Sequence, residues 1–179
     1  MPSDDSDVRE TLNQLSLPRR TGPLQALPRW FRAANRAVIL MARFGFTMGP
    51  VSVLTVPGRR TGKPRSTPVS PLTVGGRRYV VAGLPDSDWA RNVRASGHAQ
   101  LSRGRRHESV AVIEVTDSAL KERIMRAYPQ EVPKGAPMFA RFGIVGSPHP
   151  EAFAAAAGQL GIFEIRPVRR RGNSGIFTS

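Results

Sequence analysis

The segment STPVSPLTVGGRRYVVAG, residues 66–83, carries the fold prediction, because two apolar runs flank the pair Gly75-Gly76. A glycine pair between two such runs is a strong signal for a β-hairpin, since glycine readily adopts the positive φ of a tight turn. We therefore predict strands over residues 66–74 and 77–83. The β-branched run VSVLTV at residues 51–56 precedes them and predicts another strand.

The same pattern continues toward the C-terminus. Residues 98–103 and 107–116 predict a second hairpin that turns near Gly104, and residues 161–166 predict a last strand. Short strands joined by hairpins favour an antiparallel sheet that closes into a small barrel with helices at its margins. The expected fold is therefore mostly β with flanking helices (α+β), a split β-barrel. The βαβ alternation of a parallel dinucleotide-binding fold is missing.

Helices are expected where polar caps or prolines precede apolar residues. The expected segments are a short helix after Pro85 capped by Asp86 or Ser87, a helix from the cap Asp117 to about Ala127, a Pro/Gly-rich loop over residues 129–150, and an Ala-rich helix that starts at Pro150. A loop of that length points to a pocket lid or a binding loop.

The chain divides into an irregular N-terminal arm (residues 1–27), a single split β-barrel domain (residues 28–168) and a flexible basic tail (residues 169–179). The domain is expected to begin with an amphipathic helix over residues 28–44, with arginines on one side and apolar residues, including Trp30, on the other. Two interpretations stay open for this helix. Its apolar face either packs on the core or docks on an anionic membrane surface.

Charge and cysteine content exclude several classes of protein. The 179 residues carry 27 Lys and Arg against 13 Asp and Glu, a net charge of +14, and residues 11–85 contain no acidic residue. Such an excess suggests an anionic partner. The absence of cysteine excludes disulfides, thiolate nucleophiles and Cys-ligated zinc, and the three histidines lack metal-ligand spacing. Without a signal peptide or spanning segment, we expect a cytoplasmic protein, with peripheral membrane contact only through the helix over residues 28–44.

The most informative motif is PGRRTGKPRSTP, residues 57–68. It is not a P-loop, because three residues instead of four separate Gly58 from Gly62, and a proline follows Lys63. It predicts a glycine-containing turn between two strands. The turn carries four cations without a neighbouring acid: Arg59, Arg60, Lys63 and Arg65. Glycines let backbone N–H groups approach an anion and arginine binds phosphate bidentately, so the turn is either an anion site or a solvated basic hairpin tip.

Three motifs together resemble the deazaflavin (coenzyme F420)-dependent nitroreductase and quinone reductase family. They are VLTVPGRRTGKPRSTPV, GGRRYVVAG and DWARNVRASGHAQL, which occur in the family's order and spacing. The resemblance covers about residues 28–115, with support from the FEIRPV strand near the end. It implies a flavin-reductase-like split β-barrel and hydride transfer from reduced F420 to a hydrophobic acceptor, a quinone or an activated nitro compound.

The resemblance also implies which residues hold the cofactor. Arg60, Thr61 and Arg65 would bind its acidic end, together with the neighbouring cations Arg59 and Lys63. The remaining positions implied for the cofactor are Thr67, where the family often has Asn, the backbone of Val81, Ala82 and Gly83 along the ring system, the family's Trp89 and Asn92, and Arg94 as a further anion contact. Trp89 is equally well explained as a core anchor.

The acceptor side is less defined. Tyr128 is the one tyrosine that matches the region where some family members shape the substrate pocket, and it is the only candidate for a catalytic residue. The apolar side chains Met138, Phe139 and Phe142 either line an acceptor pocket or cover the barrel. No metal is implied, and flavin mononucleotide (FMN) is the alternative cofactor.

Two other functions compete with an F420-dependent oxidoreductase. A non-catalytic protein of the same fold would carry the cofactor or a fatty-acid-like ligand, an alternative prompted by the apolar residues in the loop over 129–150. A nucleic-acid-binding module would use the basic half, but the sequence lacks interleaved aromatic residues and any recognised nucleic-acid motif. Open barrels of this type often pair, so a homodimer is one assembly that the sequence allows.

Overall fold

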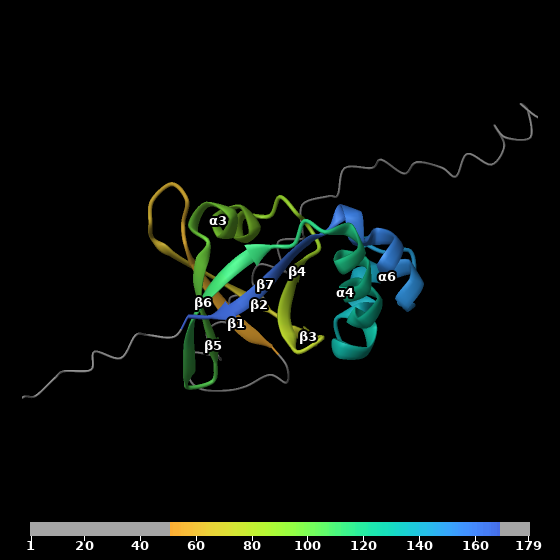
Figure 1. The fold of residues 1–179 in the computed structure, drawn as a ribbon. Helices are drawn as coiled ribbons and strands as arrows, with labels where there is room; N and C mark the ends of the chain where they lie inside the picture. The colour runs from red at the N-terminus through yellow and green to blue at the C-terminus, as the bar shows by residue number, and fades with distance from the viewer. Residues whose placement is uncertain (1–50, 169–179) are drawn as a thin grey trace, which may run out of the picture.

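The computed structural model describes residues 51–168 of the chain. Figure 1 shows the strands and helices along this range. The elements are β1 (Ser52–Pro57), β2 (Pro64–Val69), β3 (Leu72–Val74), β4 (Arg77–Ala82), α3 (Asp88–Ser96), β5 (His98–Arg103), β6 (Arg106–Glu114), α4 (Ser118–Glu131), α5 (Ala136–Arg141), α6 (Pro150–Ala156), the 3-10 helix η1 (Ala157–Gln159) and β7 (Gly161–Pro167).

The strands form one curled antiparallel sheet. Its order is β2-β1-β5-β6-β7-β4-β3, so β2 and β3 are its two edges within the part of the chain that the structure describes. Each neighbouring pair is antiparallel. The sheet wraps around to give a split β-barrel, as predicted (Figure 1).

The central hairpin forms as the sequence predicts, but the strand before it is shorter. Gly75 and Gly76 have φ values of +58° and +74° and join β3 to β4. The predicted strand over residues 66–74 is instead two strands, because the chain breaks at Ser70 and Pro71. Proline has no N–H to offer a ladder, and the break lets β2 pair with β1 while β3 pairs with β4.

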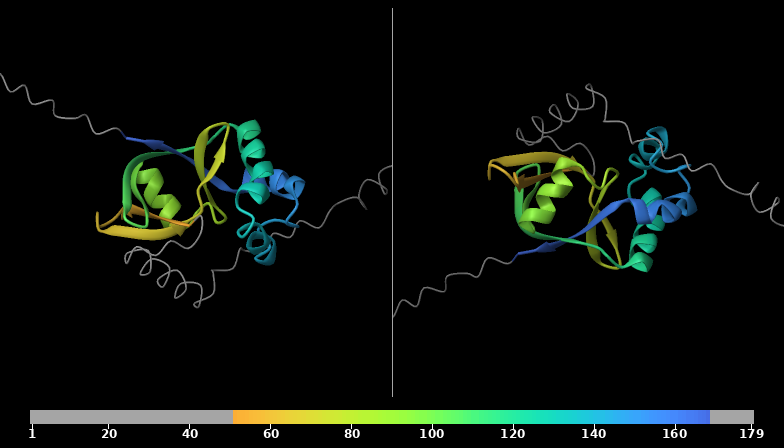
Figure 2. Two further views of the ribbon diagram at one scale, coloured as in Figure 1. Left: turned by 90° about the horizontal axis from the view of Figure 1, so that it is seen from below. Right: turned by 90° about the horizontal axis from the view of Figure 1, so that it is seen from above.

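One hydrophobic core fills the barrel. Strand alternation points every second residue inward, and α3 closes one end of the barrel by burying Ala90 and Val93 against these residues. Figure 2 shows α3 inside the curl of the strands, apart from the other helices. The largest fully buried side chains of this barrel core are Leu54, Val56, Val80, Val93, Val110 and Phe163.

A second core lies on the other side of β4 and β7, where α4 and α6 pack (Figure 2). Asp117 caps α4 as predicted, since its carboxylate accepts a hydrogen bond from Leu120 N at 2.6 Å. The helix runs to Glu131, past the predicted end at Ala127, although Pro129 lies inside its last turn and removes one i→i−4 hydrogen bond there. The predicted loop over residues 129–150 likewise contains a helix, α5.

Some predictions lie outside the described residues: the arm over residues 1–27, the amphipathic helix over 28–44 and the tail over 169–179. Within residues 51–168, no helix has both the length and the apolar character needed to cross a membrane.

Candidate cofactor-binding site

The segment over residues 58–65, which we call the basic turn, connects β1 to β2 and is ordered by its own backbone. Gly58 N–H donates to the carbonyl of Lys63 at 2.9 Å, and Gly62 N–H donates to the carbonyl of Gly58 at 2.7 Å. Gly62 has a φ of +66°, which other residues rarely adopt. A side chain at Gly58 would lie 3.1 Å from the Lys63 carbonyl, so the narrow turn also depends on that glycine. The basic turn therefore has a defined shape before any ligand binds.

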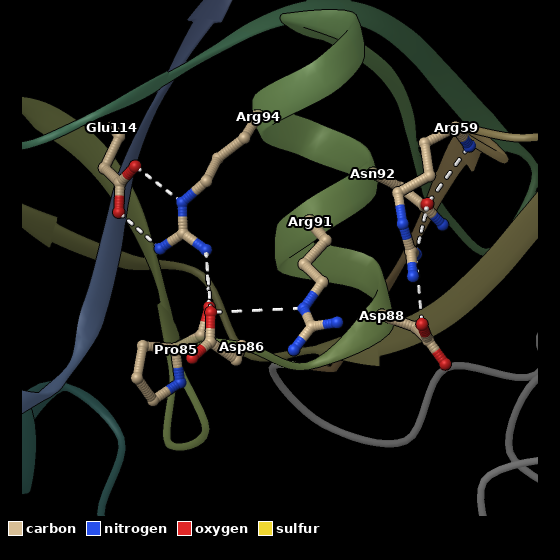
Figure 3. A network of polar contacts seen from close by, with 8 residues as sticks. All are labelled: Arg59, Pro85, Asp86, Asp88, Arg91, Asn92, Arg94 and Glu114. Atoms are coloured by element: carbon tan, nitrogen blue, oxygen red, sulfur yellow. Dashed lines mark hydrogen bonds and ion pairs between the residues drawn. The ribbon is translucent and has the colours of Figure 1, made fainter.

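Arg59 fastens this turn to α3 (Figure 3). Its backbone N–H donates to Asn92 Oδ1 at 3.1 Å, and its Nη1 donates to the same oxygen at 3.0 Å and to Asp88 Oδ1 at 3.0 Å. Asn92 is buried, so its amide oxygen depends on these two bonds. The predicted cofactor residues Arg59 and Asn92 thus contact each other, and their roles in cofactor binding stay predictions.

The other three cations of the turn are exposed: Arg60, Lys63 and Arg65. Among residues 51–168, none of them forms an ion pair with an acidic side chain within 4.0 Å. Like charges this close on one short turn repel each other, and a bound anion removes that cost. Binding of the cofactor's acidic end by these three cations stays a prediction.

The predicted threonines flank these cations. Thr61 Oγ1 accepts a long hydrogen bond of 3.4 Å from Lys63 N–H, within the turn. Thr67 lies on β2, half-buried, opposite Leu54 of β1. Both hydroxyls therefore lie on the same strand-turn-strand unit as the cations.

Arg94 is fully engaged within the fold. Its Nε and Nη2 donate to Glu114 at 2.7 and 2.6 Å, its Nη1 donates to the carbonyl of Pro85 at 2.6 Å, and its guanidinium lies 5.5 Å from the ring centre of Phe163 (Figure 3). Hydrogen bonds from Arg94 lower the pKa of Glu114. This network joins α3 to β6 and to the segment after β4, and the anion contact predicted at Arg94 stays a prediction.

The end of β4 packs closely against α5 and the segment after it. Val81 is half-buried against the second core, and Ala82 belongs to the barrel core. A side chain at Gly83 would lie 2.8 Å from Ile144 Cδ1 and 3.5 Å from the Phe139 ring. Gly83 therefore permits the close contact between the predicted ring site and the predicted acceptor loop.

Trp89 packs as a core anchor. Its ring is tilted against Phe163 at 5.5 Å between centres, and it rests on the barrel core. Trp89 lies on the first turn of α3, one turn before Asn92. Its packing supports the core-anchor interpretation and fixes the helix that carries Asn92.

Tyr128 and Phe139 are buried in the second core. The Tyr128 ring stacks on Phe153 at 5.2 Å and lies 5.0 Å from Phe139. Burial raises the pKa of the Tyr128 phenol well above its usual value. A buried phenol of raised pKa is a poor proton donor, so the geometry favours packing over catalysis for Tyr128. Of the predicted pocket residues, Phe139 is 7 % exposed, whereas Met138 is 40 % exposed.

An apolar hollow that the sequence did not predict adjoins the basic turn. It measures about 420 Å³, and its lining includes Gly62 and Pro64 together with the apolar residues Val56, Ala99 and Val110. Its walls come from β1, β5 and β6, which are far apart in sequence. Only the strand order brings them together, so no local motif could have revealed the hollow.

The comparisons with known proteins agree with this picture. The model of a family described as F420H(2)-dependent quinone reductase matches residues 28–136. No curated protein matches the chain. Solved structures with a similar chain include an F420-H2 dependent reductase, FDR-A, at 16% identity, 68% coverage of this chain, 98% of that chain and a TM-score of 0.47.

Two further solved structures match comparably. A NimC/NimA family protein from Clostridium acetobutylicum is 13% identical over 72% of this chain and 78% of its own, with a TM-score of 0.42. A chain described as a domain-swapped dimer is 15% identical over 76% of this chain and 97% of its own, with a TM-score of 0.47. Because the family model matches more than half of the chain, the protein belongs to the F420H2-dependent quinone reductase family and is an F420-dependent oxidoreductase.

Proposed function

We propose that this protein transfers a hydride from reduced F420 to a quinone-like acceptor, and that Arg60, Lys63 and Arg65 hold the acidic end of the cofactor. One observation carries the proposal: the turn is ordered and fastened through Arg59, while its three other cations have no carboxylate partner among residues 51–168. A preorganised cluster of cations binds an anion at a lower ordering cost than a flexible one.

The ring system is proposed to lie along the backbone of Val81, Ala82 and Gly83, with Trp89 supporting α3 beside it. When bound, reduced F420 supplies the hydride, and solvent supplies the proton that completes a quinol. The residues of this chain bind and orient the two reactants. Such chemistry requires no metal and no strong general base, and Thr61 and Thr67 offer neutral hydroxyls beside the cations.

The acceptor is proposed to bind where α5 and the residues after it meet the end of β4. Gly83 contacts Ile144 and Phe139 there, so a ring along β4 and an acceptor beside α5 would be adjacent. Met138 exposes apolar surface at the start of this segment, and Phe142 is half-buried at its end. The apolar surface of Met138 and Phe142, which we call the α5 rim, favours a quinone over a charged acceptor.

The apolar hollow beside Gly62 is a second place for an apolar ring, because it adjoins the basic turn. Two variants distinguish the positions. Gln100→Trp places a bulky side chain in the lining of the hollow, and Met138→Gln makes the α5 rim polar. We expect Met138→Gln to raise KM for the quinone and Gln100→Trp to leave it unchanged. The reverse result would move the acceptor to the hollow.

The test of the function is anaerobic turnover. Purified protein is mixed with reduced F420 and menadione, and the return of oxidised F420 is followed by its absorbance. Turnover that exceeds the rate without protein supports the proposal. Tight F420 binding without turnover with quinones or nitro compounds would indicate a carrier, and a preference for FMN in the same titration would replace the cofactor.

Two parts of the proposal concern partners. Peripheral contact with an anionic membrane through residues 28–44 would bring the enzyme to a membrane-resident quinone, and sedimentation with anionic vesicles tests it. Pairing into a homodimer is tested by light scattering of the eluted peak. Neither partner is needed for the proposed binding of F420.

A further inference from the structure

The apolar hollow beside the basic turn has an uncharged lining. Its described lining residues include no Lys, Arg, Asp or Glu, although the chain has a net charge of +14. The apolar members of this lining are Val56, Pro57, Pro64, Ala99, Val110 and Val168. A charged ligand would lose its hydration here without a partner of opposite charge in this lining, so the hollow favours a neutral, apolar ligand.

A row of polar side chains crosses the hollow on the outer face of the sheet. Thr55 on β1 is directly opposite Gln100 on β5, and Gln100 is directly opposite Ser109 on β6. Their neighbours Leu54 and Leu101 belong to the barrel core, so the polar row points outward. All three polar residues line the hollow. Apolar surface with a few polar groups is typical of small-molecule sites.

His98 adds an acceptor nitrogen to this lining. It precedes Gln100 by two residues on β5, so both lie on the same face of the strand, and it also lines the hollow. Its Nδ1 lies 2.7 Å from the carbonyl of Ser96, at the end of α3. A carbonyl can only accept, so Nδ1 carries the hydrogen, and in the neutral ring Nε2 keeps a lone pair. Nε2 is therefore the remaining hydrogen-bonding atom of the ring, and it accepts.

The end of α3 holds His98 in this orientation. Gly97 ends the helix with a φ of +67°, and its N–H donates to the carbonyl of Val93 at 2.8 Å. Ser96 Oγ donates to the carbonyl of His98 at 3.0 Å, which adds a second contact between these two residues. The acceptor is therefore placed by the fold before any ligand binds.

We propose that the apolar hollow binds a neutral aromatic alcohol, a phenol or a quinol, whose hydroxyl donates to His98 Nε2. The volume of about 420 Å³ lies within the range of small-molecule sites and leaves room for two fused rings. The rings would contact the apolar lining, and the hydroxyl supplies the hydrogen that Nε2 lacks. A quinone carries no such hydrogen, so this lining favours the reduced ring over the oxidised acceptor proposed to bind at the α5 rim.

The hollow contacts the basic turn without its cations. Gly62 and Pro64 belong to the basic turn and line the hollow. The three exposed cations of the turn are outside the described lining: Arg60, Lys63 and Arg65. A ligand in the hollow would leave these cations open to the acidic end of F420. We therefore expect the aromatic alcohol and F420 to bind at the same time.

The test is a fluorescence titration of the full-length protein with 2-naphthol and with 2-methoxynaphthalene, which has the same rings but no hydroxyl hydrogen. We expect the wild type to bind 2-naphthol about three- to tenfold more tightly, the effect of one hydrogen bond. His98→Phe keeps an aromatic ring and removes Nε2, so it should bind both probes with the same affinity. Gln100→Trp places a bulky side chain in the lining and should abolish the binding of both.

His107→Phe is the matched control. His107 is an exposed histidine on β6, outside the described lining of the hollow, and its Nδ1 lies 2.9 Å from Ser102 Oγ. The variant should keep the preference for 2-naphthol. Circular dichroism of the three variants checks that they fold.

Competition experiments separate the hollow from the two sites of the proposed function. Neither saturating F420 nor menadione should displace 2-naphthol from the wild type. Menadiol, kept reduced under argon, distinguishes the two sources of the hydroxyl. Its displacement of 2-naphthol supports a quinol as the ligand, whereas unchanged binding of 2-naphthol supports a simple phenol.

Any of five results would overturn the inference. They are no binding of 2-naphthol up to its solubility limit, equal affinity of the wild type for both probes, unchanged binding in Gln100→Trp, an equal loss of preference in His98→Phe and His107→Phe, and displacement of 2-naphthol by F420 or menadione. The last result would assign the hollow to the cofactor or to the acceptor. The naphthol titrations run without cofactor, so a failure of F420 binding or of turnover leaves the inference standing.

Discussion

Replacing Asn92 with alanine tests how the basic turn is held. The buried Asn92 oxygen accepts both the backbone N–H and Nη1 of Arg59, at 3.1 and 3.0 Å. The variant leaves the partly buried Arg59 N–H without its partner, whereas Nη1 keeps Asp88. An orphaned buried donor costs about 1–3 kcal/mol, and we expect about 2 kcal/mol here. Alanine favours the helix slightly, so the measured loss is a lower bound.

For a chain of this length, a loss of that size lowers the unfolding midpoint by roughly 4–8 °C. Thermal unfolding followed by circular dichroism measures it. The matched control is Asp88→Asn, because the Asp88 side chain is 87% exposed and its ion pair with Arg59 contributes about 0.5 kcal/mol or less.

The same variant should weaken F420 binding, since a released turn must be ordered again when the ligand binds. We expect an affinity loss of about three- to tenfold, the ordering cost of one or two side chains. If Asn92→Ala unfolds at the same temperature as Asp88→Asn, Asn92 does not hold the basic turn in place through Arg59. If it unfolds earlier but binds F420 as tightly as the wild type, the link between an ordered turn and binding is wrong.

Three more predictions follow from the packing and the ion pairs. Gly83→Ala should lower kcat/KM for menadione, because the added Cβ would lie 2.8 Å from Ile144 Cδ1. Adding Ile144→Val removes that methyl group and should restore kcat/KM. A double variant as slow as Gly83→Ala alone would contradict this contact. Tyr128→Phe should keep turnover within about twofold, and a fall of about 100-fold would make the phenol a catalytic acid after all. Hydrogen bonds from Arg166, and then the charge of Arg77, lower the pKa of Glu164. The ionised Glu164 carboxylate therefore stabilises the fold at pH values above the usual carboxyl pKa of 4.5, and this stabilisation is lost as the pH falls through the lowered pKa. In Glu164→Gln, the unfolding midpoint should fall less steeply as the pH is lowered. A fall as steep as that of the wild type would refute the role of Glu164.

The sequence predicted the hairpins well, because their signals are local. Gly75-Gly76 and Gly104 mark the two tight turns, and both turns form with positive φ at these glycines. Pro71 can end the strand predicted over residues 66–74. Whether the strand breaks there depends on which neighbouring strand each half pairs with. That pairing is set by the whole sheet and has no local signature.

The sequence groups the cations of the candidate site but does not show which residues they contact. The cations of the turn could be read as a group, yet nothing in the sequence shows that Arg59 pairs with Asn92, 33 residues away, or that Arg94 pairs with Glu114. These partners meet only because α3 closes the barrel.

Cofactor binding at the basic turn is tested most directly by titrating the protein with F420 and following the cofactor fluorescence, with FMN as the control ligand. We predict tight binding that prefers F420 to FMN and that weakens by about tenfold or more in the double variant Arg60→Gln/Arg65→Gln, the loss expected for charge-assisted contacts on an exposed turn. Arg123→Gln, which removes an exposed charge from α4, should bind as the wild type does. Equal affinity in the wild type and the Arg60→Gln/Arg65→Gln variant, or a preference for FMN, would contradict the binding of F420 at the basic turn.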